Sequence, residues 1–305
     1  MDWNTEFPDK RYENTNESLV RQAQLITLRI LKIVDKVCRE NDIDYWIEGG
    51  TLLGAVRHGG FIPWDDDLDI AMPREDYERF LQIAPKELPE ELFIQNLQTT
   101  PLAGNTWTQI KDKKSKMVLD KNAEYHQGIY IDIFPCDTYS QNTLKRFFKE
   151  EILRKLYIFA YAVNAPFKKP AFTKENLLKN IAKGALKVIF FPFAIFNKDV
   201  IYDINLKTRD KRIERMKRNP KLSYGYGTDV LNFDTIFNID TIYPLKKIKF
   251  EDGEFMAPND TDTYLKEMYG DYMKIPPENK RVQHHIEIKP ILSEEEIIEL
   301  NKNFK

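Results

Sequence analysis

Apolar residues recur every three or four positions between Leu19 and Val37, which is the spacing of one face of an α-helix. Asn16 or Ser18 is placed to cap this helix, which should end near residues 39–41. An amphipathic helix of this length is expected to cover one face of a sheet that begins at Asp44.

Shorter apolar runs predict the strands of that sheet and a second helix. The predicted strands are 45–47, 67–70, 92–94, 106–111 and 128–134, the last ending at Pro135. The second helix opens at Pro73, where a missing N–H does no harm, and runs to about Ala84.

The C-terminal part returns to strand signals. Residues 247–250 and 255–257 flank Asp252-Gly253 and predict a hairpin. Residues 264–269 predict a short helix closed by Gly270, and Ser293 with Glu296 forms a capping box for a last helix. The whole pattern indicates an α+β fold, with a small mixed sheet flanked by helices.

A helical pattern rich in Lys and Arg runs from Thr143 to about Asn219 and predicts a helical insertion. The expected domains are a core over 1–142, the insertion over 143–240 and a C-terminal segment, 241–305, that returns to the core. The most apolar stretch, 185–196, is too short to span a bilayer and is interrupted by Pro192. It is either a helix buried against the core or a peripheral membrane contact. In the second case phenylalanines would enter lipid head groups and lysines would meet anionic lipid, namely Phe190, Phe191, Phe193, Phe196, Lys179, Lys183, Lys187 and Lys198.

Composition narrows the class of protein. The 305 residues carry a formal net charge of −2, so no global basic field recruits nucleic acid. Cys38 and Cys136 lie in apolar contexts without metal-ligand spacing and are expected to be buried thiols. The first residues do not resemble a signal peptide and no run is long enough for a membrane span, so a cytoplasmic protein is expected.

The chemistry is expected within residues 45–72, where a strand, a Gly-Gly turn, a helix start and several acids follow one another. Gly49, Gly50 and Thr51 allow a close approach of backbone amides to phosphate. On a strand, Asp67 and Asp69 would project from the same face. Paired carboxylates suit Mg²⁺, with Mn²⁺ as the alternative ion.

These parts match the needs of phosphoryl transfer, which requires fixed metal ions, donors to the phosphate and a positioned acceptor. Asp67 and Asp69 would hold the metal. Asp132, the acid within 128–134, would complete a second metal site or take the acceptor's proton. The alternative interpretations are a solvated acidic loop at 65–69 and a core acid at Asp132.

Other candidates surround these residues. Arg57, His58 and Lys111 could clamp phosphate or acceptor, although isolated residues of these types are often surface groups. His126 is expected in a turn, and alternation separates His284 from His285. Five aromatic residues near the motifs, Trp64 among them as a substrate-binding candidate, are core residues by default or a cage for a quaternary ammonium group. They are Trp46, Trp64, Trp107, Tyr125 and Tyr130.

Three runs carry a family resemblance: YWIEGGTLLGAVRHGGFIPWDDDLDIAMPREDYERF, QGIYIDIFPCD, and FEDGEFMAPND followed by YLKEMYGDYMKIPP. They resemble the signature of the LicD family, the phosphocholine transferases and their fukutin-related relatives, over about residues 20–140 and 243–290. The resemblance implies a nucleotidyltransferase-like catalytic core. By position, its glycine turn falls on Gly49 and Gly50, and its acids fall on Asp67, Asp69 and Asp132. The 17 residues from Gly50 to Asp67 exceed the usual spacing, which leaves Asp65 as a rival first ligand.

The resemblance implies a Mg²⁺-dependent phosphotransferase that moves phosphocholine from CDP-choline to a hydroxyl of a cell-surface glycan precursor, of teichoic-acid or lipopolysaccharide type, and releases CMP. The acceptor would be a lipid-linked glycan at the inner face of the cell membrane. A donor such as CDP-ribitol, CDP-glycerol or a sugar nucleotide is the first alternative. The second is a non-catalytic glycan- or nucleotide-binding module, against which the intact Asp67, Asp69 and Asp132 argue.

Overall fold

The computed structural model describes two compact units, one of residues 1–136 and 237–305 and one of residues 137–236. The predicted domain boundaries, after 142 and after 240, stay predictions. Within the chain the described residues are 2–13, 16–96, 98–100, 107–118, 125–152, 155–156, 159, 174–190, 207, 222–227, 230, 235–281, 287–302 and 304.

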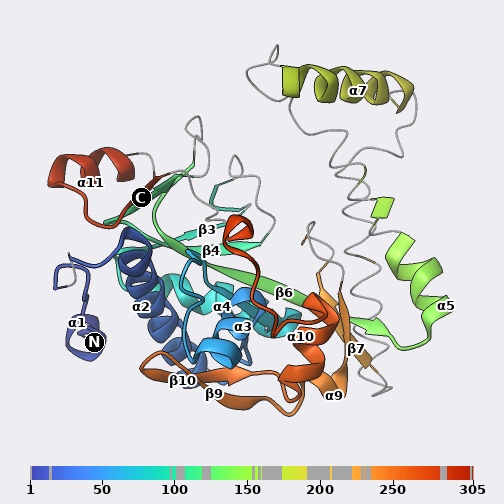
Figure 1. Ribbon diagram of the computed structural model, residues 1–305, viewed down its shortest axis with the longest axis horizontal. Coiled ribbons are helices and arrows are strands. Elements are labelled where there is room, and N and C mark those ends of the chain that lie inside the picture. Colours follow the sequence, from blue (N-terminus) through green and yellow to red (C-terminus); the bar gives the residue numbers. More distant parts are fainter. Residues whose placement is uncertain are drawn as a thin grey trace. The chain divides into compact units, whose positions relative to one another are not determined.

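The first unit is built on a mixed sheet whose strands lie in the order β1-β2-β6-β4-β3. Their bounds are β1 (Trp46–Ile47), β2 (Asp69–Pro73), β6 (Tyr130–Ser140), β4 (Thr108–Asp112) and β3 (Leu92–Gln95). Figure 1 labels three of them, β6, β4 and β3. Strands β2 and β6 are parallel, and the other neighbours in this order are antiparallel. The expected α+β class with a mixed sheet is confirmed.

Helices pack beside this sheet and close its core. Helix α2 (Leu19–Glu40) begins at the Ser18 cap, as predicted, and buries Ile30, Leu31 and Ile33. Ile131 and Ile133 of β6 are also fully buried. Each such side chain contributes about 1.5–3 kcal/mol when it leaves water. Two further helices, α3 (Gly49–His58) and α4 (Arg74–Glu87), pack against β2.

Three local predictions are wrong. The Gly-Gly pair does not form a turn before the helix, because α3 begins at Gly49 itself with Glu48 as its cap. Strand β2 starts at Asp69, so Asp67 precedes the strand, although Leu68 between them is buried as alternation requires. Strand β6 continues beyond Pro135. Its pairing with β4 extends only to Ile133, so no backbone hydrogen bond from Pro135 to β4 is needed.

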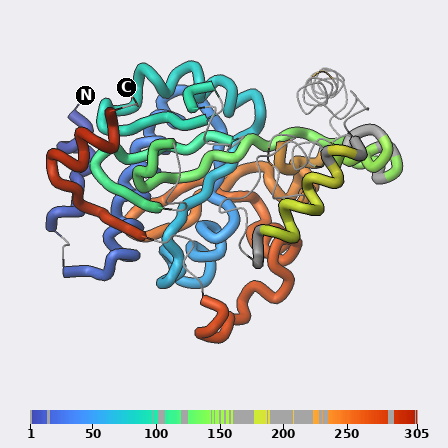
Figure 2. The backbone as a smooth tube through the Cα atoms, turned by 90° about the horizontal axis from the view of Figure 1, so that it is seen from above, coloured from blue at the N-terminus to red at the C-terminus, as the bar shows by residue number. Residues whose placement is uncertain are grey.

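The C-terminal segment returns to the first unit. It forms the predicted hairpin, β9 (Lys246–Phe250) with β10 (Gly253–Ala257), preceded by α9 (Ile239–Ile242). Helix α10 (Thr261–Tyr269) ends at Gly270 and packs on α3, and α11 (Glu294–Asn301) has the capping box. A short turn, η4 (Glu278–Lys280), follows α10, and β11 (Glu287–Lys289) pairs with β5 (Lys116–Val118). Figure 2 shows α11 near the N-terminal residues.

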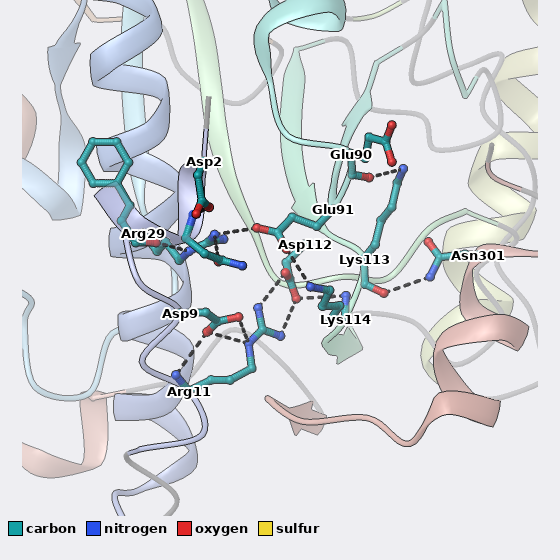
Figure 3. Close-up of polar contacts among 12 residues, drawn as sticks. Asp2, Asp9, Arg11, Arg29, Glu90, Glu91, Asp112, Lys113, Lys114 and Asn301 are labelled. Carbon is teal, nitrogen blue, oxygen red and sulfur yellow. Dashed lines mark hydrogen bonds and ion pairs between the residues drawn. The ribbon is translucent and has the colours of Figure 1, made fainter.

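A buried ion pair fastens the N-terminal segment, which contains α1 (Trp3–Glu6), to the sheet. The Arg11 guanidinium donates to both carboxylate oxygens of Asp112 at the end of β4, at 2.8 and 2.7 Å (Figure 3). Both side chains are 1% exposed. Arg11 also donates to Asp9 and to the carbonyl of Pro290. One cation therefore joins the N-terminal segment, β4 and the C-terminal segment.

The second unit contains α5 (Thr143–Arg146), the π-helical turn η2 (Phe147–Glu151), α7 (Lys174–Phe190) and β7 (Leu222–Tyr226), and β8 (Ile236–Asn238) crosses its end. Strands β7 and β8 lie beyond residue 219, where the predicted helical pattern ends, and their short aromatic stretches fit a strand. The hydroxyl of Tyr139 on β6 donates to the carbonyl of Tyr226 on β7 at 2.6 Å.

Part of the apolar stretch 185–196 can be placed. Residues 185–190 belong to α7, and 191–196 lie outside the described residues. Among the described helices, none combines the length and apolarity that crossing a bilayer needs. Cys38 and Cys136 are buried, as predicted.

Candidate active site

The site is built on a row of polar residues that crosses the sheet. Asp69 on β2 pairs with Asp132 on β6, which pairs with Gln109 on β4, which pairs with Gln95 on β3. Residues in register on neighbouring strands project from the same face of the sheet. Gln95 Nε2 donates to Gln109 Oε1 at 3.0 Å, and Gln109 Nε2 donates to Asp132 Oδ1 at 2.9 Å. The row therefore orients Asp132.

Asp132 receives a second donor from the indole of Trp107, whose Nε1 lies 2.6 Å from the same Oδ1. Burial raises the pKa of Asp132, the hydrogen bonds from Gln109 and Trp107 oppose this, and the charge of Asp67 raises it further, to about 6. A carboxyl group with this pKa, fixed through one oxygen, can accept or release a proton near neutral pH.

Three more aspartates precede or open β2, and we call Asp65, Asp67, Asp69 and Asp132 the acid cluster. Burial raises the pKa of Asp69 well above its usual range, and the charges of Asp67 and Asp132 raise it further. The pKa of Asp65 is raised to about 9, first by burial and then by the charge of Asp67 and a hydrogen bond with its carboxylate. Two carboxyl groups can share a hydrogen bond only when one of them is protonated.

Helix α3 begins against these acids. Gly49 has a φ of +56°, and a Cβ there would lie 3.4 Å from Asp69 Oδ2. A Cβ at Gly50 would lie 2.9 Å from Asp65 Oδ2, which is closer than real contacts allow. The hydroxyl of Thr51 accepts a hydrogen bond from the amide of Asp69 at 2.8 Å. Gly49 is therefore favoured by its left-handed backbone, and Gly50 by the close approach of the helix start to Asp65, in addition to any role toward phosphate.

The negative charges around Asp69 favour the binding of a divalent cation at the acid cluster. The largest charges that act on Asp69 all come from carboxylates, and each of them raises its pKa. Within the described residues, no three His, Cys, Asp or Glu side chains are arranged so that they could hold a metal ion as they stand. Hard oxygen donors that repel one another fit Mg²⁺ in their chemistry. The neighbouring Asp67, which raises the pKa of Asp65, marks a place where a cation could bind between carboxyl groups.

The sequence did not single out two groups at this site. Glu48 is buried, its amide donates to the carbonyl of Asp69 at 3.1 Å, and its carboxylate accepts from the hydroxyl of Tyr264 at 3.1 Å. Tyr269 comes from the end of α10, and its hydroxyl lies 3.5 Å from the position of a Cβ at Gly49. Burial and then the charge of Asp69 raise the pKa of Tyr269. An acid directly before a Gly-Gly pair is a sequence signal that could have indicated Glu48. Tyr269 has no such signal, because only the packing of the fold brings it to the site.

Lys111 lies on the same face of β4 as Gln109, but it is buried and engaged. Its Nζ donates to the carbonyl of His126 at 2.6 Å and lies 5.3 and 4.8 Å from the ring centroids of Tyr125 and Tyr130. Burial lowers the pKa of Lys111 to about 7, although the charge of Asp132 opposes this. Two of the rings considered as core residues or as a cage for a ligand cation thus lie beside a lysine of the protein.

His126, expected in a turn, is a fully buried group in the segment that leads into β6. Its Nε2 lies 3.1 Å from Asn301 Oδ1, and its Nδ1 accepts from the amide of Gly128. Burial and then the charge of Lys111 lower the pKa of His126 to about 4. The other two candidate histidines, His284 and His285, lie outside the described residues.

Arg57, His58 and Trp64 form a separate group held by the C-terminal segment. Arg57 donates to His58 Nε2 and to the carbonyl of Tyr272, both at 3.0 Å. Burial and then the charge of Arg57 lower the pKa of His58. The Arg281 guanidinium lies 4.6 Å from the ring centroid of Trp64. Across the part of the chain that the structure describes, no hydrogen bond joins this group to the acid cluster.

The fold and the site together define an α+β protein with a partly solvent-exposed carboxylate cluster beside a helix start. The family model described as LicD/FKTN/FKRP, nucleotidyltransferase domain, matches residues 42–178. The lipopolysaccharide cholinephosphotransferase LicD of Haemophilus influenzae is 30% identical over 274 residues, which cover 90% of this chain and 98% of that protein. The chain therefore belongs to the LicD family.

More distant relatives share shorter segments. An uncharacterized protein of Rickettsia typhi is 34% identical over 135 residues, 44% of this chain and 40% of that protein. The human ribitol 5-phosphate transferase FKRP is 59% identical over 34 residues, 11% of this chain and 7% of that protein. The family match includes Glu48 and the whole acid cluster.

Proposed function

We propose that this protein is a phosphotransferase with a nucleotidyltransferase-like core that moves phosphocholine from CDP-choline to a hydroxyl of a cell-surface glycan precursor and releases CMP. The observation that carries the proposal is the acid cluster, in which the largest charges that act on Asp65 and Asp69 come from other carboxylates. The similarity over 98% of a cholinephosphotransferase supports the choice of reaction. The acceptor would be a lipid-linked glycan at the inner face of the cell membrane.

Asp67 and Asp69, with Asp65 beside them, would hold Mg²⁺ or Mn²⁺. The bound ion would offset the charge of the donor's phosphates. The chain itself supplies the start of α3, whose free amides at Gly49, Gly50 and Thr51 favour an anion, and this end of the helix carries partial positive charge.

Asp132 is the candidate general base. Gln109 and Trp107 both donate to its Oδ1, which leaves Oδ2 to take the proton of the acceptor hydroxyl. Its pKa of about 6 keeps it ionised at neutral pH and within reach of proton transfer. Lys111 contributes a buried positive charge that favours the ionised form of Asp132.

Arg57, His58 and Trp64 would contact the donor or the acceptor. The cation of Arg281 over Trp64 and that of Lys111 between Tyr125 and Tyr130 occupy aromatic faces that a choline cage would use. The second candidate function is therefore transfer of a phospho-alditol from CDP-ribitol or CDP-glycerol, a choice favoured by the identity with a ribitol 5-phosphate transferase.

The test is CMP release with Mg²⁺, a glycan acceptor and separate CDP-linked donors. We expect turnover with CDP-choline, and about tenfold less with CDP-ethanolamine if aromatic rings recognise the methyl groups. Robust transfer from CDP-ribitol alone would favour the second function. Nucleotide or glycan binding without CMP release from any donor would indicate a non-catalytic module.

A further inference from the structure

Helix α7 (Lys174–Phe190), which is labelled in Figure 1, presents four large apolar side chains to solvent. Leu177, Leu178, Ile181 and Val188 are 39%, 73%, 59% and 75% exposed. Their spacing places them along one side of the helix. We call these four side chains the α7 stripe.

The described polar side chains of α7 do not shield the α7 stripe. Asn180 and Lys183 are half-buried, Lys179 is exposed, and all three take part in interactions. A surface helix of a globular domain normally buries its apolar stripe. The exposed α7 stripe therefore indicates a contact with another apolar surface.

We propose that α7 lies in the interface of an anionic lipid bilayer, with the α7 stripe in the boundary between head groups and acyl chains. The helix contains four lysines and one glutamate, so its charge complements anionic lipid. At 17 residues it is about 25 Å long, and no described helix is suited to cross a bilayer, so the contact is parallel to the surface.

The same features argue against a second protein copy as the occupant. Two α7 helices joined through their stripes would bring two cationic helices together, which like charges oppose. The α7 stripe is purely aliphatic and lacks the aromatic and arginine anchors that centre a protein interface.

The experiment is co-sedimentation of the full chain with vesicles of phosphatidylcholine alone and of phosphatidylcholine with phosphatidylglycerol, without any donor or acceptor. Binding is expected with the anionic vesicles and should weaken at high salt. Leu178→Ser with Val188→Ser should weaken it at least ~10-fold, because each side chain loses apolar burial. Ile298→Ser, which alters a 69% exposed residue on α11 in the other unit, is the matched control and should bind like the wild type.

Because the substituted side chains are exposed, the Tm of the variants should equal that of the wild type. An unchanged Tm shows that weaker binding is not caused by a loss of fold. Wild-type protein that stays in the supernatant, or a double variant that binds like the wild type, would overturn the proposal. A concentration-dependent dimer that the double variant abolishes would assign the α7 stripe to a second copy instead. CMP release is not measured, so the result is independent of the proposed function.

Discussion

Asp112 and Asp69 are carboxylates on two strands of one sheet, and their surroundings are opposite. Asp112, at the end of β4, meets the guanidinium of Arg11 through two hydrogen bonds. Asp69, at the start of β2, meets mainly other carboxylates, which raise its pKa. The first arrangement is complete without a ligand. The second is unfavourable until a cation or protons are supplied, which is how a binding site differs from a structural ion pair.

Asp67→Asn and Asp69→Asn should produce the largest effect, a loss of at least ~10³ in the rate of CMP release, because fixed metal charge is worth several kcal/mol. The same changes remove repulsion between acids. Urea unfolding in EDTA at pH 8 should therefore show equal or greater stability for the variants. A variant with near-wild-type turnover would remove that residue from the metal site.

Arg11→Met should act in the opposite sense on stability. It leaves Asp112 buried without its cation and should cost about 3–5 kcal/mol in the free energy of unfolding. The double change Arg11→Met with Asp112→Leu should recover much of the loss, because no buried charge then remains. If Arg11→Met unfolds at the same urea concentration as the wild type, the Arg11–Asp112 pair does not stabilise the fold, and the comparison with Asp69 fails.

Asp65 predicts a pH effect in metal-free protein. Its pKa is about 9 in the folded chain against 3.8 ordinarily, so between these values the folded state binds more protons than the unfolded state. The stability that this carboxyl contributes is fully present below pH 4 and is lost as pH rises toward 9. From pH 7 to 9 in EDTA, wild type should lose at least ~1 kcal/mol relative to Asp65→Asn. Parallel stability curves would contradict the raised pKa.

Tyr269→Phe should give the smallest of these effects, about a tenfold fall in kcat/KM, because one hydroxyl beside the acid cluster is lost. Tyr272→Phe is the matched control: that hydroxyl bonds the exposed Asp262 at 2.9 Å, and activity should stay within about twofold of wild type. Equal effects of the two substitutions would mean that Tyr269 acts only through packing.

The sequence predicted best where the signal is local. Periodicity and the Ser18 cap determine α2, and alternation around Leu68 brings Asp67 and Asp69 to the same side. The partners of Asp132 depend on strand register, which no local pattern specifies, so the roles of Gln109 and Trp107 appeared only in the structure.

Distance along the chain explains the remaining misses at the site. Tyr269 lies 200 residues from Asp69 and reaches it through the packing of α10 on α3. Lys111 was a candidate to clamp phosphate or acceptor. Its burial beside Tyr125 and Tyr130 depends on the fold and cannot be predicted from the local sequence.

The central claim, that the acid cluster is a cation site, is tested most directly by thermal unfolding of wild type and Asp69→Asn at pH 8, with EDTA and then with Mg²⁺ at several concentrations. A ligand that binds only the folded state raises stability with its concentration, by about 2.7 kcal/mol at 100 times the Kd. The account predicts that Mg²⁺ raises the Tm of the wild type and leaves that of Asp69→Asn nearly unchanged. A wild-type Tm that does not respond to Mg²⁺, or an equal rise in both proteins, would contradict it.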